Sequence, residues 1–252
     1  MELKSAKCLK YAKSANIATD ISGLDQYLNG GLQQGKVYEL VGRAGSGKTQ
    51  LCMRLCLNIQ LPQYEYGSEA KAIYFDTRKD FDPIRLKELA EELVTRPSVR
   101  QTSGLLPTAT EMLRNVFYVD CHTAAHLVAG LLNCYKYLAR EPNIKLIIVD
   151  SISFAIRSLD NILARTELLM ELHTVMRKLQ MKHNLTFVLT NNLAFRRKRR
   201  RRFELEAVLG QKHAQIINKR IWLMKNGCFL GKWSKTKSEF LLVTHFWAFD
   251  EI

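Results

Sequence analysis

The chain of 252 residues is 47% hydrophobic, which is enough to bury a full core as one large domain or two small ones. Its formal net charge of +14 favours a polyanionic partner. No apolar segment exceeds about ten residues and no apolar core follows the charges of the opening residues, which excludes a membrane span and argues against a secretory signal.

Short apolar segments alternate with longer segments of helical periodicity along most of the chain. We expect strands at 37–41, 72–75, 116–119, 145–149, 185–190 and 220–224, and helices at 48–60, 83–94, 124–140 and 162–182. A strand followed by a helix, repeated, predicts an α/β fold with right-handed crossovers and a mostly parallel central sheet flanked by helices. Two further strand-like stretches, at 228–233 and 240–249, have no helix between them and predict a C-terminal β-hairpin extension.

The sequence GRAGSGKT follows the first of these strands and precedes the first helix. This is the P-loop pattern in its required context, because glycines let backbone N–H groups converge on phosphate oxygens at a helix N-terminus. We expect Lys48 to reach the terminal phosphates and Thr49 to bind Mg²⁺; an ordinary tight turn is the alternative. The predicted nucleotide-contacting residues are Gly42, Arg43, Ala44, Gly45, Ser46, Gly47, Lys48, Thr49 and Gln50.

The segment LIIVD, residues 146–150, has the composition of a buried parallel strand that ends in a carboxylate. Many strands end in aspartate, but this one follows the P-loop within an alternating α/β pattern, as a Walker-B aspartate does. We therefore expect Asp150 to hold Mg²⁺ together with Thr49, through a water molecule.

Six cysteines are spread along the chain without a CxxC pair. Cys121, His122, His126 and Cys134 cluster loosely, but their spacing fits no common zinc pattern, so we interpret these cysteines as ordinary reduced or buried thiols. This cysteine usage indicates the cytosol or the nucleus.

Several stretches together resemble the eukaryotic RecA-type recombinase family. The first is DISGLDQYLNGGLQQGKVYELVGRAGSGKTQLCMRL, and AIYFDTRKDFDPIRLKELA resembles the next strand and helix of the family. IKLIIVDSISFAIRS and LTFVLTNN resemble its Walker-B strand and the strand after it. The resemblance is greatest to the C-type paralogue of the strand-exchange recombinase, in a divergent form such as the meiotic versions of insects.

The resemblance implies a RecA-type P-loop NTPase core over residues 16–252, after a short segment at 1–15 in which the family's helical DNA-binding domain does not fit. It implies ATP and Mg²⁺ as cofactors, and single-stranded DNA and related recombinase subunits as partners, with no membrane. The process would be homologous recombination in the nucleus. It also places Arg85 against the adenine and a mobile DNA-binding loop after Asn192.

Departures from the family affect the expected chemistry. The family has a glutamate that orients the attacking water and then a glycine, where this chain has Arg78 and Lys79. The residue after Asp150, where many other P-loop ATPases keep a glutamate, is Ser151. Asn192 replaces a glutamine that senses the γ-phosphate, and no clear polymerisation segment is found.

Arg78 cannot act as a general base, because its guanidinium stays charged at any useful pH. One hypothesis is that it pairs with a phosphate, which predicts tight nucleotide binding with weak or lost hydrolysis. A second is that Asp80, or a carboxylate of a partner subunit, restores turnover, so the catalytic residue stays open. A third is that Arg78 simply points to solvent in a site no longer used for catalysis.

A run of seven cations between Phe195 and Phe203 has three interpretations. As a DNA-binding loop it would follow phosphates while an aromatic ring stacks on a base. It also fits a nuclear import signal, or a solvated loop without a partner. The run consists of Arg196, Arg197, Lys198, Arg199, Arg200, Arg201 and Arg202.

The function that the sequence favours is an ATP-binding recombinase paralogue that assembles with related subunits in repair or meiotic exchange. Nucleotide would then act as an assembly clamp by stabilising the bound conformation. One alternative is an active DNA-dependent ATPase with a rewired carboxylate, and the other is a non-enzymatic scaffold subunit. Whether the chain is an enzyme stays open at this point.

Overall fold

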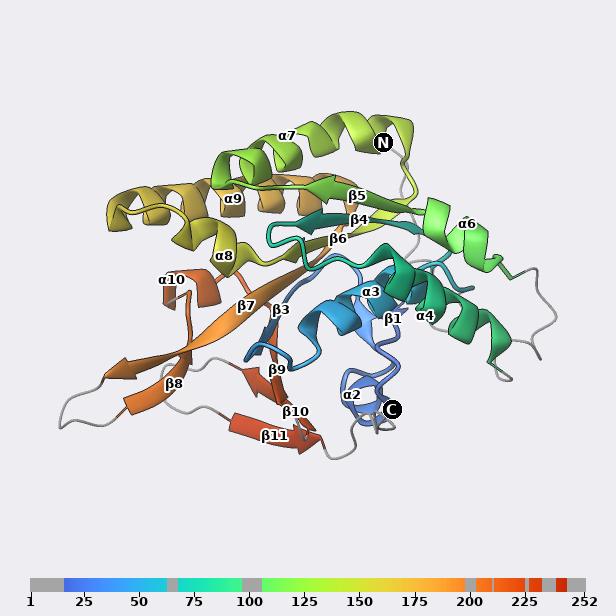
Figure 1. The fold of residues 1–252 in the computed structure, drawn as a ribbon, viewed down its shortest axis with the longest axis horizontal. Coiled ribbons are helices and arrows are strands. Elements are labelled where there is room, and N and C mark those ends of the chain that lie inside the picture. Colours follow the sequence, from blue (N-terminus) through green and yellow to red (C-terminus); the bar gives the residue numbers. More distant parts are fainter. Residues whose placement is uncertain are drawn as a thin grey trace, which may run out of the picture.

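The computed structural model describes residues 16–62, 68–96, 106–197, 203–209, 211–224, 227–232 and 239–243. Among these residues nine strands form one sheet, and a parallel set in the order β9-β3-β7-β6-β4-β5 makes up its centre (Figure 1). These strands are β3 (Val37–Gly42), β4 (Lys71–Asp76), β5 (Val116–Asp120), β6 (Ile144–Asp150), β7 (Thr186–Arg197) and β9 (Lys219–Met224). The predicted α/β fold with a mostly parallel sheet is confirmed.

The remaining strands are antiparallel and extend this sheet. The strands β10 (Gly227–Lys232) and β11 (Glu239–Val243) continue outward from β9 as the expected hairpin extension. The strand β8 (Phe203–Ala207) pairs with the second half of β7. A separate two-stranded sheet joins β1 (Asn16–Ile17) to β2 (Leu32–Gln33).

Helices cover both faces of the parallel strands, as Figure 1 shows. One core cluster contains residues of α2 (Ser22–Tyr27), α3 (Lys48–Asn58), α4 (Pro83–Thr95) and α6 (Ala109–Arg114). The other contains residues of α7 (Ala124–Arg140), α8 (Ile152–Arg157) and α9 (Ile162–His183). The short helix α10 (Gln211–Ala214) precedes β9.

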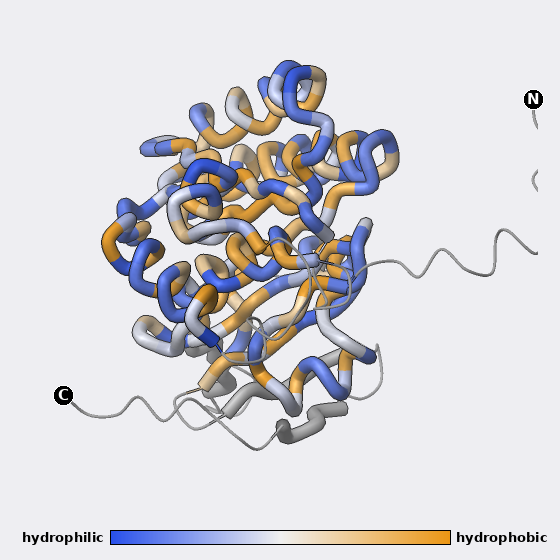
Figure 2. The backbone as a smooth tube through the Cα atoms, turned by 90° about the vertical axis from the view of Figure 1, so that its right-hand side faces the viewer, coloured by the Kyte–Doolittle hydropathy of each residue, from blue (hydrophilic) through white to orange (hydrophobic). Residues whose placement is uncertain are grey.

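Along each central strand, successive side chains point alternately into one core cluster and the other. On β4, Ala72 and Tyr74 pack toward α3 and α4, whereas Ile73 and Phe75 pack toward α7 and α9. A strand that is buried on both faces is apolar at successive positions, which is why these segments are apolar runs rather than alternating patterns. Figure 2 shows the same arrangement, with hydrophobic strands inside helices of mixed character.

Polar caps fix where the long helices begin. The side chain of Asp82 accepts from the backbone N–H of Ile84, and Pro83 occupies the first turn of α4. Thr123 caps α7 and Asn161 caps α9 in the same way. Such caps satisfy backbone donors that have no partner within the helix, so the predicted helix starts at 83, 124 and 162 coincide with the observed ones.

The expectation of a loop directly after Asn192 is wrong for residues 193–197. The strand β7 continues to Arg197 and pairs with β8, from Leu193 opposite Ala207 to Arg197 opposite Phe203. Pairing gives the backbone groups of both segments partners that a loop would leave to water. The rest of the basic run, residues 198–202, lies outside the described residues, as does the 244–249 part of the last predicted strand.

Cys52, Cys56, Cys121 and Cys134 are free thiols buried in the core, as the sequence predicted. Burial raises the pKa of the Cys121 thiol to about 11 and that of Cys134 to about 12, so both stay protonated at neutral pH. In the described part of the chain no three potential metal ligands lie together, and no helix has both the length and the apolar composition needed to cross a bilayer.

Candidate functional site

The predicted P-loop joins the end of β3 to the start of α3. Gly42 is the last residue of β3, and a Cβ atom there would lie 2.6 Å from the carbonyl oxygen of Leu223 on the neighbouring strand. Gly47 is the N-cap of α3 and has φ of 86°, a left-handed conformation that favours glycine. The residues Arg43 to Gly45 between these glycines are exposed, as a loop that receives an anion from solvent requires.

Lys48 is 8% exposed and lies in the first turn of α3. Its ammonium group donates to the carbonyl oxygens of Gly42 at 2.9 Å and Arg43 at 2.8 Å, which holds it beside the loop. Burial lowers the pKa of Lys48, the charge of Arg78 acts in the same direction, and Asp150 opposes both. The charges of Arg78 and Asp150 therefore both act on Lys48.

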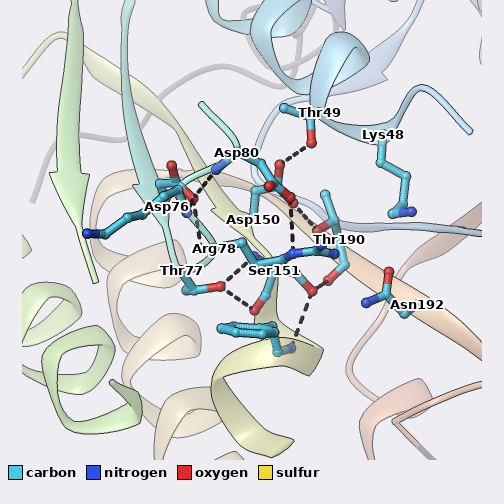
Figure 3. Close-up of polar contacts among 12 residues, drawn as sticks. Lys48, Thr49, Asp76, Thr77, Arg78, Asp80, Asp150, Ser151, Thr190 and Asn192 are labelled. Carbon is cyan, nitrogen blue, oxygen red and sulfur yellow. Dashed lines mark hydrogen bonds and ion pairs between the residues drawn. The ribbon is translucent and has the colours of Figure 1, made fainter. Parts of the chain in front are cut away.

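Asp150, at the end of β6, accepts three hydroxyl hydrogen bonds, and Figure 3 shows those from Thr49 and Thr190. Thr49 and Tyr74 donate to its Oδ2 atom at 2.7 Å each, and Thr190 donates to Oδ1. Burial and the charge of Asp150 raise the pKa of Tyr74, so its hydroxyl remains a donor. The structure thus brings together the two residues that the sequence predicts as Mg²⁺ ligands, Thr49 and Asp150.

The turn after β4 is organised by Asp76, whose side chain is buried. Its carboxylate accepts from the backbone N–H groups of Arg78 and Lys79 at 2.9 Å each and of Phe81 at 3.0 Å. Lys79 has φ of 61°, which is again the left-handed region. Asp76 therefore fixes the backbone from which the Arg78 and Asp80 side chains extend.

Arg78 occupies the position at which the resemblance implies a glutamate. Its Nε atom is 3.0 Å from Asp80 Oδ2, and its guanidinium carbon lies 5.7 Å from the centre of the Phe154 ring. Its side chain is 32% exposed, so it is held between these two groups rather than extended into solvent. This arrangement leaves Asp80, the other carboxylate considered from the sequence, engaged in an ion pair.

Ser151 and Asn192 occupy the remaining positions singled out beside Asp150. The Ser151 hydroxyl donates to the backbone oxygen of Thr190 at 3.1 Å and lies 2.9 Å from the Ser153 hydroxyl. The backbone N–H of Asn192 donates to Ser153 Oγ at 3.2 Å. Asn192 lies in the middle of β7, and Figure 3 shows its side chain on the same side of the site as Lys48.

Arg85 lies apart from this group of residues, and of the basic run the structure describes only the backbone of Arg196 and Arg197. Arg85 is near the start of α4 and forms an ion pair with Glu88 at 2.7 Å, and it pairs with no residue of the P-loop in the described part of the chain. Arg196 and Arg197 belong to β7, beyond Asn192. Gln50 lies in the first turn of α3, next to Thr49.

Sequence reasoning missed the residues that orient the site, namely Tyr74, Thr190, Asp76 and Phe154. A tyrosine in an otherwise apolar buried strand was a usable signal, because a buried hydroxyl requires a hydrogen-bond partner. For Asp76 the signal was an aspartate at the end of a strand and directly before a turn, where its carboxylate caps backbone N–H groups.

A parallel α/β sheet with a glycine-rich loop after β3 and a buried carboxylate at the end of β6 defines a RecA-like P-loop core. The family model described as Rad51 matches residues 10–199. The chain belongs to the Rad51 family.

Relatives of known name agree with this assignment. "DNA repair and recombination protein RadA" of Aeropyrum pernix is 32% identical over 204 residues, or 78% of this chain and 59% of that protein. "DNA repair protein RAD51 homolog 3" of Cricetulus griseus is 32% identical over 187 residues, or 70% of this chain and 51% of that protein. This chain thus spans little more than half the length of these relatives.

Proposed function

We propose that residues 16–252 form the ATP-binding core of a recombinase paralogue. Its role is in homologous recombination, in DNA repair or meiosis, on single-stranded DNA in the nucleus. The observation that carries the proposal is the hydrogen bond between Thr49 and Asp150 beside the buried Lys48. Family membership and the names of the relatives, which refer to DNA repair and recombination, support it.

The donor set of the site fits a Mg²⁺–ATP complex. Mg²⁺ prefers hard oxygen ligands, and the hydroxyl of Thr49 and the carboxylate of Asp150 provide two of them side by side. When bound, the ion would neutralise phosphate charge. The backbone N–H groups of the exposed loop residues Arg43 to Gly45 and the ammonium group of Lys48 would bind the phosphates.

Nucleotide hydrolysis by this core is proposed to be weak or lost. The guanidinium of Arg78 cannot accept a proton from water, and its ion pair with Asp80 keeps that carboxylate from serving as a base. The same guanidinium suits a phosphate oxygen, so Arg78 strengthens nucleotide binding instead. Nucleotide then stabilises an assembly-competent conformation by mass action.

A second candidate, an active DNA-dependent ATPase, is supported by the position of Asp80. Its side chain is 44% exposed and forms an ion pair with Arg78. If a partner or DNA drew Arg78 away, Asp80 would become available beside the site. An Asp80→Asn variant that lost all turnover would favour this candidate.

DNA contact is proposed for the hairpin of β7 and β8. The hairpin begins directly after Asn192, so the basic run starts in the same strand whose middle, at Asn192, lies beside the proposed nucleotide site. If the run binds about five phosphates of a single strand, the slope of log K against log salt should be near −3.5. A slope near zero would remove DNA contact and leave nuclear import or a solvated loop.

Assembly with related subunits is supported by the free edge of β5. This strand ends the sheet order among the described residues, and its Tyr118 is 45% exposed. Beside it is a cavity of about 360 Å³ lined by apolar side chains that include Phe117, Val119 and Ile144. An extended segment of a related recombinase subunit could add to the edge and place an apolar side chain in this cavity.

Titration of the chain with a fluorescent ATP analogue, in Mg²⁺ and in EDTA, tests the proposal. Lys48→Ala removes the phosphate-binding cation and should weaken binding at least about tenfold in both conditions. Thr49→Val should weaken binding in Mg²⁺ only, because it removes a metal ligand. Lys178→Ala, an exposed lysine on α9, is the control. Equal binding by all these variants would contradict a nucleotide site at the P-loop.

A further inference from the structure

A second cavity lies at the end of β3 opposite to the P-loop. It has a volume of about 290 Å³ and lies between α9 and the segment that connects α10 to β9. Val37, the first residue of β3, forms part of its wall, whereas Gly42 at the other end of the strand opens the P-loop. The cavity is therefore separate from the nucleotide site.

Polar groups dominate the wall of this cavity. Arg177 of α9 contributes a guanidinium group that pairs with no described residue. Asn218 uses its side-chain oxygen to accept from the backbone N–H of Val37 at 2.7 Å, which leaves its NH₂ group available as a donor. Gln215, which is exposed, adds a further amide. Cationic and amide side chains thus line the cavity, and no carboxylate is among its lining residues.

The inner wall is formed by His173, which is 6% exposed. Its Nε2 atom lies 2.9 Å from Nδ1 of His213, and His213 Nε2 lies 3.1 Å from Glu39. The Nδ1 atom of His173 is buried and has no hydrogen-bond partner among the described residues. Burial and the neighbouring His213 lower the pKa of His173 to about 3, so Arg177 supplies the positive charge at neutral pH.

We propose that this cavity binds a small oxyanion, either a carboxylate or a phosphate. Arg177 forms charge-assisted hydrogen bonds with the anion, and the amide of Asn218 donates a further one. The imidazole of His173 closes the site on the side of the core. The volume is at the lower end of the range for ligand pockets, which fits a compact anion rather than a nucleotide.

Binding at this cavity can be observed separately from binding at the P-loop. The chain is labelled at histidine, and the imidazole resonances of His173 are followed by NMR during titration with inorganic phosphate or malonate at constant ionic strength. A Lys48→Ala background removes phosphate binding at the P-loop. Arg177→Met tests the cavity, and Lys178→Met, at the adjacent exposed lysine, is the matched control.

The proposal predicts saturable shifts of His173 in both the wild-type and the Lys48→Ala chains. Binding should weaken about tenfold or more in Arg177→Met and stay unchanged in Lys178→Met. Saturation by phosphate alone or malonate alone would identify which oxyanion the site prefers. Shifts that never saturate, or that persist unchanged in Arg177→Met, would overturn the proposal.

Discussion

In the turn after β4, the side chain of Lys79 adds backbone strain. Lys79 is exposed and has φ of 61°, and the carboxylate of Asp76 accepts hydrogen bonds that hold the turn in this shape. A residue with a Cβ atom pays a steric penalty in this region, whereas glycine does not. The family resemblance places a glycine at this position.

Lys79→Gly should therefore raise the free energy of unfolding, by about 0.5–1 kcal/mol after the greater freedom of glycine in the unfolded chain is subtracted. Lys79→Ala is the control, because it removes the charge and keeps the Cβ atom. Urea denaturation of the three chains measures the difference. A gain in Lys79→Ala equal to that in Lys79→Gly would attribute the effect to charge rather than to backbone strain.

Tyr74 is a positioning residue for the proposed Mg²⁺ site, because its hydroxyl donates to Asp150 from a buried strand. Tyr74→Phe should weaken nucleotide binding in Mg²⁺ by about tenfold, as is usual for groups that orient a metal ligand, and leave binding in EDTA unchanged. Tyr118→Phe is the matched control, since that hydroxyl is 3.4 Å from Asp76 and not bonded to Asp150. Equal losses with and without Mg²⁺ would show that Tyr74 acts only on folding.

At the scale of elements, a series of polar contacts runs from α9 through the core to β9. His173 on α9 joins His213 on α10, and His213 contacts Glu39 on β3, which also pairs with Arg220 of β9. Burial opposes ionisation of Glu39, but His213 and Arg220 outweigh it and hold the pKa of Glu39 below its ordinary value. The ionised carboxylate is thereby fixed at the centre of the sheet.

This connection predicts a pH dependence of stability. Because the pKa of His173 is lowered from 6.5 to about 3, below pH 6.5 the unfolded chain binds a proton that the folded chain does not. Stability should fall with decreasing pH, by up to about 1.4 kcal/mol per unit between pH 6.5 and about 5. Glu39 adds nothing until the pH approaches its ordinary pKa of 4.5, since it is ionised in both states above that.

The comparison of wild type with His173→Leu measures this dependence. The variant has lower stability overall, because His213 loses a partner, but its slope in the same window should be smaller by about one proton. Denaturant unfolding at several pH values gives both slopes. Parallel slopes would mean that His173 takes up its proton in the folded chain as readily as in the unfolded one.

Local patterns explain why part of the site could be predicted from the sequence. The P-loop and the strand that ends in Asp150 are continuous segments whose chemistry is encoded by neighbouring residues. The contact of Tyr74 with Asp150 depends on the register of β4 and β6, in which Asp76 is opposite Asp150, and this register is not encoded in either strand alone. The pair His173 and His213 is likewise set by packing between distant segments.

Short or irregular elements also could not be predicted from the sequence pattern. The helix α8 has six residues, too few for a helical period to be recognised, yet it places Phe154 against Arg78. The continuation of β7 into a hairpin depends on a partner strand on the far side of the basic run. Element existence was thus predictable where a segment is long and shows helical periodicity, as for α7 and α9.

At the scale of the whole molecule, the sheet lies between two apolar core clusters. The polar residues of the site lie at the carboxyl ends of its parallel strands. Lys48, Thr49, Asp150 and Arg78 come from three different strand ends, and the buried layers fix their separation. The proposed nucleotide site departs from the family pattern in having a cation, Arg78, in place of a base. The central claim is therefore binding without turnover.

ATP turnover measured together with ATP binding tests this claim most directly. Wild type, Lys48→Ala and Arg78→Glu are compared with and without single-stranded DNA. Wild type should bind ATP and hydrolyse it no faster than Lys48→Ala, and Arg78→Glu should gain DNA-stimulated hydrolysis of at least about tenfold, the lower range for a positioned base. Hydrolysis by wild type that Lys48→Ala abolishes would contradict the account, and Asp80 would then be the residue that supplies the base.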